Sequence, residues 1–231
     1  TLTRGQFDGD NTLTTQIKTY IPSTEGVEFL VFPTYGDFSL IVHDIRYQKV
    51  PSYDTHSVYD QSWHKVHESY YDLDGESILV SGGYHAVDYG YDRYDNTTFL
   101  RYYDLEDNPT RNTSGYAELH REYNWSRQIL QESYFDENQE PAYLSSGYSI
   151  VKYDYDAAGN IEWTRYFDGE ENPVMINNGS YSVLRRFFDS HKWQIREEYY
   201  DSEDLPVVAK SGYAAIDYER DNVGNAVVIR Y

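Results

Sequence analysis

The feature that most constrains this chain is a tandem repeat of about 32 residues. An aromatic pair followed by aspartate recurs five times, and successive aspartates lie 32, 32, 32 and 33 residues apart, at Asp72, Asp104, Asp136, Asp168 and Asp201. A glycine follows eleven residues after each aspartate, at Gly83, Gly115, Gly147, Gly179 and Gly212. A period of this length indicates an array of similar units in which each unit packs against its neighbours.

The repeat divides the chain into two predicted parts. Residues 52–231 form the array, with a half unit at 52–69 and full units that begin near residues 70, 102, 134, 166 and 199. Residues 1–51 lack the repeated columns, and we expect them to form a short N-terminal β segment, either a β-sandwich remnant or a cap. Because Tyr231 is the first residue of another unit, we also expect the chain to belong to a longer protein.

Each unit is predicted to be an antiparallel β-hairpin. In the fifth unit, bulky residues recur near period 2 around Tyr213–Tyr218, a Gly/Asn turn follows, and Ala226–Tyr231 is rich in β-branched residues. Pro206–Ala209 is predicted to form a short third strand. The whole is therefore an all-β, elongated array of about five hairpin repeats, either solenoid-like or a single-layer sheet. We expect the repeated tyrosines to form ladders and one aliphatic column to form the core, namely Val87, Leu119, Val151, Leu184 and Ile216.

The glycine that precedes each repeated tyrosine is predicted to reverse the chain with a positive φ. The fourth unit has one extra residue between Asp168 and Tyr181. A one-residue slip would move the aliphatic column to the other face of the sheet. We therefore expect a bulge or a longer turn to absorb the extra residue and to leave Leu184 in register.

Composition excludes several classes of partner and site. The net charge of −20 argues against binding to nucleic acid or to an anionic membrane surface. The chain has no cysteine, which excludes disulfides and thiolate metal sites, and it has no apolar run long enough for direct membrane insertion. Its 27 Tyr, 9 Phe and 4 Trp residues provide enough apolar surface for a folded protein.

Two short motifs resemble known bacterial repeats. The segment Tyr155–Asn160, followed by Tyr166-Phe167-Asp168, resembles the YD repeat of RHS-type surface proteins. The segment Tyr70–Glu76, which leads to Ser81-Gly82-Gly83-Tyr84, is similar to the β-hairpin units of cell-wall-binding and glucan-binding repeats. Both resemblances imply an extracellular module, on a bacterial cell surface or secreted, within a larger surface protein or envelope enzyme.

Two sets of residues are candidates for binding. The four tryptophans lie outside the repeated core columns and are predicted to contact a glycan, at Trp63, Trp125, Trp163 and Trp193. The alternating oxygen ligands of one acidic turn suit Ca²⁺, at Asp72, Asp74 and Glu76, although solvated β-turns explain them equally well. No other cofactor is expected.

No catalytic motif is present, since the sequence contains no nucleophile elbow, HExxH motif or phosphate loop. We therefore expect a non-catalytic module that binds glycan or cell-wall polymer. The alternative is a structural spacer or a stalk for protein–protein interaction, because the repeat alone accounts for most residues. The two differ in whether the tryptophans form an exposed row or are buried.

Overall fold

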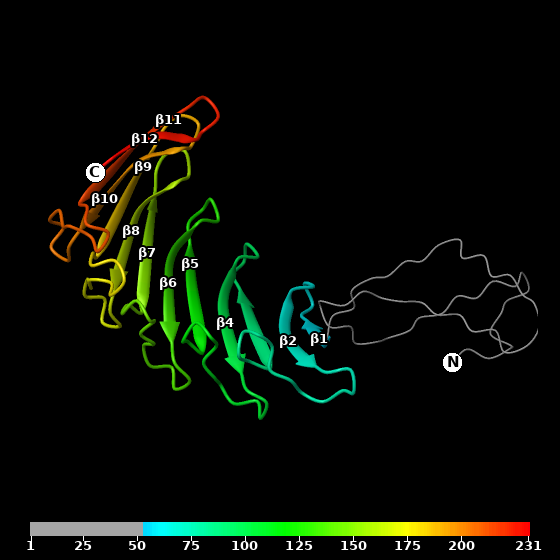
Figure 1. The fold of residues 1–231 in the computed structure, drawn as a ribbon. Helices are drawn as coiled ribbons and strands as arrows, with labels where there is room; N and C mark the ends of the chain where they lie inside the picture. The colour runs from blue at the N-terminus through cyan, green and yellow to red at the C-terminus, as the bar shows by residue number, and fades with distance from the viewer. Residues whose placement is uncertain (1–52) are drawn as a thin grey trace, which may run out of the picture. The chain divides into compact units, whose positions relative to one another are not determined.

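The computed structural model describes residues 53–231, which form one open antiparallel sheet (Figure 1). Twelve strands pair in chain order, which confirms the all-β hairpin array. The strands are β1 (Asp54–Tyr59), β2 (Lys65–Tyr71), β3 (Ala86–Tyr91), β4 (Thr97–Tyr103), β5 (Glu118–Tyr123), β6 (Ile129–Phe135), β7 (Ile150–Tyr155), β8 (Ile161–Phe167), β9 (Val183–Phe188), β10 (Gln194–Tyr200), β11 (Ala215–Arg220) and β12 (Ala226–Arg230). Within residues 53–231 no helix has the length and apolarity to cross a membrane. The N-terminal β segment predicted for residues 1–51 lies outside the described residues.

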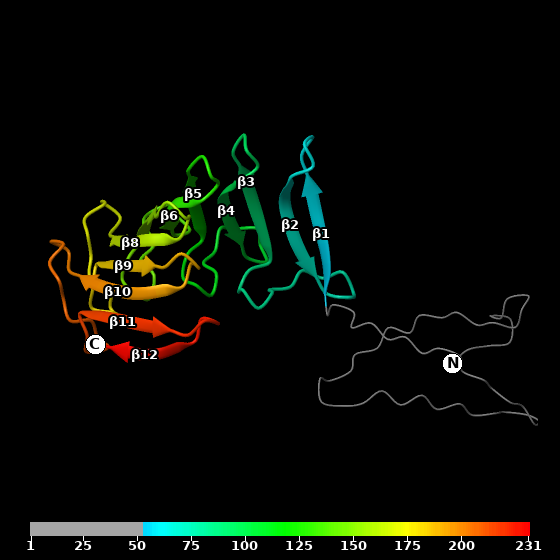
Figure 2. The same cartoon turned by 90° about the horizontal axis from the view of Figure 1, so that it is seen from above.

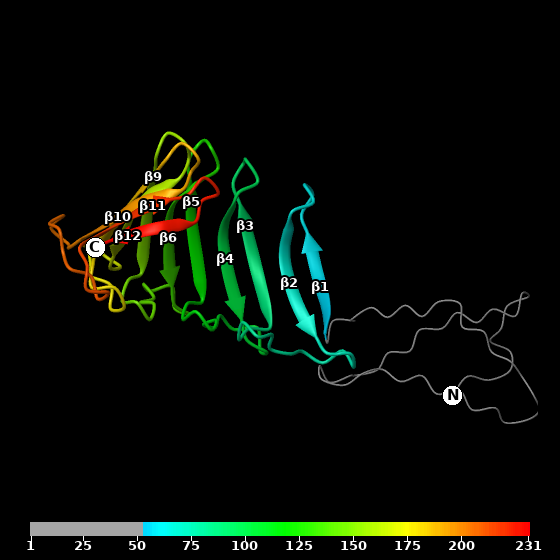
Figure 3. The same cartoon turned by 45° about the horizontal axis from the view of Figure 1, so that its top comes forward.

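The sheet twists along its length. Figures 2 and 3 show that β11 and β12 run in a direction quite different from that of β1 and β2. Such a twist follows from the preferred geometry of strands of L-amino acids. No second sheet covers the described array, so the core must come from the short segments that connect one hairpin to the next.

Two kinds of five-residue turn share one hydrogen-bonding pattern. The tip turns join the two strands of a hairpin, and the base turns follow its second strand. Figure 1 shows the two kinds of turn at opposite ends of the strands. In the tip turn Asp92–Asn96, the Asp92 Oδ1 atom accepts the backbone N–H groups of Tyr94 (2.8 Å) and Asn96 (3.0 Å). The Asp92 N–H donates to the Asn96 carbonyl (3.0 Å), and the fourth residue, Asp95, has a φ of 65°. This is a type I turn with a G1 bulge, and it explains why each turn begins with Asp or Asn.

A third turn, the connector turn, reverses the chain before the next hairpin. Gly83, Gly115, Gly147 and Gly212 have φ values between 81° and 96°, which confirms the predicted role of the repeated glycine. The prediction is wrong at Gly179, because the extra residue lengthens this turn and Ser180 takes the left-handed conformation with a φ of 58°.

The extra residue is absorbed within that turn, as predicted. Leu184 pairs with Thr164 on one side and with Tyr199 on the other. Leu119 has the equivalent partners, Leu100 and Tyr134, in the second unit. The aliphatic column therefore stays on one face of the sheet through all units.

One face, called here the core face, carries the aliphatic column and a ladder of tyrosines. The aliphatic residues are buried, and connector residues such as Ala142 and Ala209 pack against them. Ten tyrosine rings follow one another with centroids 4.6–6.2 Å apart, in the order Tyr53, Tyr70, Tyr84, Tyr102, Tyr116, Tyr134, Tyr148, Tyr166, Tyr181 and Tyr199. The predicted ladder is therefore confirmed, and it runs continuously from unit to unit.

The short third strand predicted at Pro206–Ala209 is not a regular strand. Pro206 forms an isolated bridge with Tyr200, and the Val207 N–H donates to the Tyr199 carbonyl (3.0 Å). Proline has no N–H to extend a ladder, and the chain reverses again at Ala209.

Polar groups on the core face are paired through a few carboxylates. Glu132 accepts hydrogen bonds from the hydroxyls of Tyr134 (3.2 Å) and Tyr153 (3.1 Å) and from the Arg121 Nε atom (2.8 Å). Burial, reinforced by this carboxylate, raises the pKa of both tyrosines. Two buried hydroxyls of residues 53–231 have no partner, those of Ser149 and Ser182.

Candidate functional site

The tip turns of the first three hairpins place three aromatic side chains in solvent. Trp63 is 83% exposed, Trp125 is 85% exposed, and Tyr94, in the turn between them, is 40% exposed. The rings of Tyr94 and Trp125 meet edge to face, with centroids 6.0 Å apart. These three residues and the polar groups around His64 are called here the tip edge.

Trp63 occupies a strained position in its turn. It is the fourth residue, with a φ of 64°, where the other tip turns have Asp95, Arg127, Gly159, Lys192 and Gly224. A left-handed conformation is costly for a residue with a Cβ atom and unusual for a bulky aromatic one. One of the four tryptophans is thus exposed at a position where the backbone is strained. Strained residues of this kind concentrate at functional sites.

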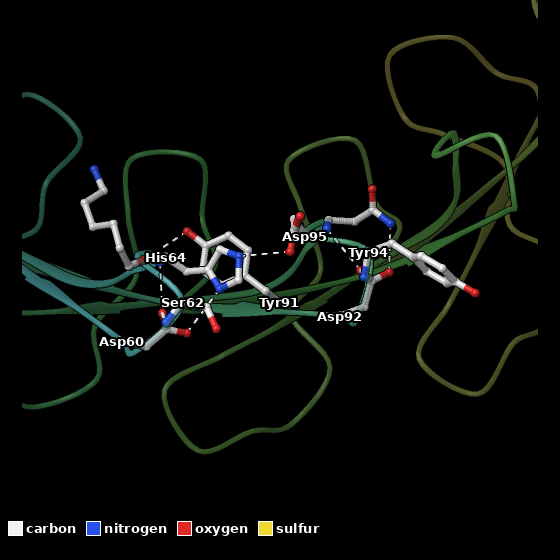
Figure 4. A network of polar contacts seen from close by, with 9 residues as sticks. Asp60, Ser62, His64, Tyr91, Asp92, Tyr94 and Asp95 are labelled. Atoms are coloured by element: carbon white, nitrogen blue, oxygen red, sulfur yellow. Dashed lines mark hydrogen bonds and ion pairs between the residues drawn. The ribbon is translucent and has the colours of Figure 1, made fainter.

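His64 links two successive tip turns (Figure 4). Its Nδ1 atom lies 3.1 Å from Asp60 Oδ2 in its own turn, and its Nε2 atom lies 2.9 Å from Asp95 Oδ1 in the next turn. The imidazole stacks on the Tyr91 ring with centroids 4.8 Å apart. Since Trp63 precedes His64 and Tyr94 precedes Asp95, this bridge fixes the spacing of the turns that carry the two aromatics.

The charges of the bridge support each other. The hydrogen bond to Asp60, followed by the one to Asp95, raises the pKa of His64 above its ordinary value. The backbone N–H of His64, which donates to Asp60, contributes most to lowering the pKa of Asp60. The bridge is therefore strongest where His64 is protonated and both carboxylates are ionised.

The other two tryptophans are half-buried: Trp163 lies on β8, and Trp193 is the last residue of the tip turn Asp189–Trp193. Trp163, on β8, lies between the guanidinium groups of Arg165 (4.7 Å from the ring centroid) and Arg185 (4.4 Å). Trp193 stacks on His191, with centroids 4.8 Å apart. The structure thus does not gather the four tryptophans into one row, and only two of them belong to the tip edge.

The acidic turn predicted to hold Ca²⁺ is one of the base turns. The Oδ1 atom of Asp72 accepts the backbone N–H groups of Asp74 and Glu76, both at 2.9 Å. Within residues 53–231 no group of three or more His, Cys, Asp or Glu side chains could hold a metal ion, so Asp72, Asp74 and Glu76 do not form a ligand set.

Sequence reasoning placed Trp63 and Trp125 near turns but missed Tyr94 and the bridge of His64. The available signal was the last position of the tip turn. Three other turns have asparagine there, at Asn96, Asn160 and Asn225, and each asparagine Nδ2 donates back to the first aspartate of its own turn. His64 makes the same contact and, in addition, reaches the next turn.

Comparisons with known proteins leave the family open. No protein-family model matches the chain, and no curated protein matches it. Among solved structures, the chain is similar to a chain of the Photorhabdus luminescens Tc holotoxin pore that carries the mutation TccC3-D651A, with 13% sequence identity and a TM-score of 0.36. The similarity covers 77% of this chain and 9% of that chain. A likeness of this degree carries no argument about function.

Proposed function

We propose that this chain is a non-catalytic repeat module that binds a glycan or cell-wall polymer through its tip edge. The observation that carries the proposal is Trp63, an indole 83% exposed on a backbone with a φ of 64°. The left-handed φ belongs to the turn, because Asp95, Arg127 and Lys192 have φ values of 61–65° at the same position and Gly159 and Gly224 occupy it without strain. Turn formation therefore does not require tryptophan there. A role in binding explains why an unfavourable residue is present.

The chemistry of the tip edge suits a neutral polysaccharide. The face of an indole or phenol ring packs against the C–H groups of a sugar, and carboxylates accept hydrogen bonds from its hydroxyls. Successive tips are two strands apart, about 10 Å at the usual strand spacing, which is comparable to the length of a disaccharide. The net charge of −20 disfavours polyanions and leaves neutral glycans as the favoured class.

The proposed setting is extracellular, on a bacterial cell surface or in a secreted protein. It rests on the YD-like and cell-wall-binding-like motifs of the sequence, which are typical of modules in large surface proteins and envelope enzymes. In such a module, the hairpin array would hold the parent protein close to the polymer that it recognises.

Binding to insoluble polymers tests the proposal. Pull-downs should retain the native chain on α-glucan or peptidoglycan and not on teichoic acid, a polyanion; retention on teichoic acid alone would contradict the preference for neutral glycans. The double variant Trp63→Ala/Trp125→Ala should be lost from that polymer. The matched control is Val223→Ala, because Val223 is 70% exposed in the last tip turn. Failure of the native chain to bind any of them, or equal retention of the double variant, would refute the proposal.

The second candidate is a structural spacer or a stalk for protein–protein interaction. It is favoured by the direct hydrogen bonds between successive connector turns, in which Thr113 N–H donates to the Gly82 carbonyl and Lys210 N–H to the Gly179 carbonyl, both at 2.8 Å. A spacer needs no exposed tryptophan. Substitution of Trp63 and Trp125 would then leave every interaction of the chain unchanged.

A further inference from the structure

A polar pocket lies on the outer face, the face opposite the tyrosine ladder, within the first full unit. It is open to solvent and has a volume of about 320 Å³. Its lining comes from β2, from β3 and the residue before it, from the end of β4, and from Asp107 in the base turn that follows β4. The residues that the argument uses are His67, Ser69, Tyr71, His85, Asp88 and Tyr103.

Asp88 is held in place by two donors. His67 Nδ1 lies 2.7 Å from Asp88 Oδ1, and the Tyr103 hydroxyl donates to Asp88 Oδ2 at 2.6 Å. Burial, followed by the bond to Asp88, raises the pKa of Tyr103 to about 12, so the phenol remains a donor at neutral pH. An ionised carboxylate has about four acceptor positions, so Asp88 retains free ones that a ligand can use.

His85 is the most buried residue of the pocket, with only 3% of its surface exposed. Its Nδ1 atom lies 3.2 Å from the Ile78 carbonyl, an acceptor, and so Nδ1 carries the proton and Nε2 is left as an acceptor. Its ring also packs edge to face on Tyr71, with centroids 5.2 Å apart. Nε2 is not among the buried polar atoms without a partner in residues 53–231, so it is accessible from the pocket and free to accept a hydrogen bond from a ligand.

The cluster departs from the repeat, whereas the core columns keep to it. The position of His85 is occupied in later units by small residues, Ala117, Ser149, Ser182 and Ala214. The position of His67 is occupied by Phe99, Gln131, Trp163 and Arg196. The position of Asp88 is occupied by His120, Lys152, Arg185 and, in the last unit, by another aspartate, Asp217, which there pairs with Arg196 (2.7 Å). No later unit combines the two histidines with the aspartate. The fold therefore does not demand this combination, and a ligand accounts for it.

We propose that this pocket binds a single neutral sugar ring. Sugar hydroxyls donate and accept at once, and the pocket offers acceptors on Asp88 and His85 beside the hydroxyl of Tyr71, which accepts from Ser69 Oγ (3.4 Å) and keeps its own proton to donate. Anions are disfavoured because Asp88 and Asp107 both border the pocket, and within residues 53–231 no group of three or more His, Cys, Asp or Glu side chains could hold a metal ion. This site is separate from the tip edge and does not rest on the function proposed for it.

An NMR titration of the full chain with methyl glycosides of glucose, galactose and N-acetylglucosamine tests the inference. We expect saturable shifts of the His67 and His85 ring signals, with a dissociation constant in the millimolar range because the pocket is open. The variants His85→Ala and Asp88→Asn should each weaken binding by about tenfold or more, since the first removes an acceptor and the second replaces one acceptor oxygen by a donor NH2 group. Alanine fits at position 85, where two other units have it.

The controls separate this site from the tip edge. His120→Ala, one unit further along the same face, and the double variant Trp63→Ala/Trp125→Ala should both leave the dissociation constant unchanged. The absence of saturable shifts at glycoside concentrations of about 100 mM would overturn the proposal. Equal affinity of the Asp88→Asn variant would do the same, as would saturable shifts with acetate or trimethylammonium in place of the glycosides.

Discussion

The strain at Trp63 leads to a prediction in which glycine and alanine have opposite effects at two exposed tryptophans. Trp63 is the fourth residue of its tip turn and has a φ of 64°. Trp125 is the second residue of its own tip turn, where a type I turn requires an ordinary right-handed conformation. We expect glycine to be more stable than alanine at position 63 and less stable than alanine at position 125.

The magnitude follows from two opposing contributions. A left-handed conformation costs a non-glycine residue roughly 1–2 kcal/mol, which glycine avoids. Glycine in turn costs roughly 0.4–1 kcal/mol because it has more conformational freedom in the unfolded chain. Trp63→Gly should therefore exceed Trp63→Ala in unfolding free energy by about 0.5–1 kcal/mol, and Trp125→Gly should fall below Trp125→Ala by about as much.

Urea denaturation of the four single variants, followed by tyrosine fluorescence or circular dichroism, measures both differences. The comparison of glycine with alanine at one site cancels the loss of the indole itself, including its contact with Tyr59 or Tyr94. If the proposed function is right, all four variants should also bind polymer less well. Trp63→Gly would then gain stability over Trp63→Ala while it lost function.

Differences of the same sign at both positions would refute this reasoning. Alanine equal to glycine at position 63 would mean that the backbone there relaxes without cost in the variant. The argument that a strained residue has been retained for function would then lose its basis, although the exposure of Trp63 would remain.

Three other measurements probe the array. Ser149→Ala should raise the unfolding free energy by about 1 kcal/mol, since it removes a buried hydroxyl without a partner. Glu132→Leu should lower the unfolding free energy by about 2 kcal/mol, because two tyrosines and an arginine lose their acceptor. Shifts of the denaturant midpoints in the opposite directions would contradict both expectations. Gly147→Ala should destabilise more than Gly212→Ala in the same assay, because both residues have φ near 90° but only at Gly147 would the added Cβ meet a neighbouring side chain, at 2.7 Å. Because its pKa is raised in the folded state, His64 should stabilise the fold below its ordinary value near 6.5 and lose this effect as pH rises through the folded value. Thermal unfolding between pH 5.5 and about 8 should show a decrease in melting temperature that His64→Asn reduces, and an unchanged pH profile in that variant would show that the bridge contributes nothing.

Much of the fold could be predicted because one period imposes the same physical demand on every unit. The register of Leu184 followed from the repeat, since a slip would have exposed the whole aliphatic column. The conformation of Gly179 did not follow, because an extra residue leaves two ways to place a positive φ within one turn. Ser180 has it in the structure, and no pattern of the sequence distinguishes it from its neighbour.

The candidate site could be predicted only in part, for a related reason. Position along the turn fixed where Trp63 and Trp125 lie, but exposure depends on which neighbours reach them, and Trp163 is covered by arginines from two strands. The bridge of His64 depends on a residue 31 positions further along the chain, which only the stacking of hairpins brings close. Such contacts between units do not appear in the periodicity of any single column.

The same distinction indicates where function resides in this array. On the core face, every unit must bury the same columns, so a residue there reports on folding. The tip turns need only Asp or Asn at their first position, and the outer face tolerates aspartate, histidine, lysine or arginine at one position, so these places are free to vary. Both candidate sites, at Trp63 and at His85, lie where a unit departs from its neighbours at some cost in strain or burial. A departure that the fold does not require and that carries a physical cost is what a ligand can explain.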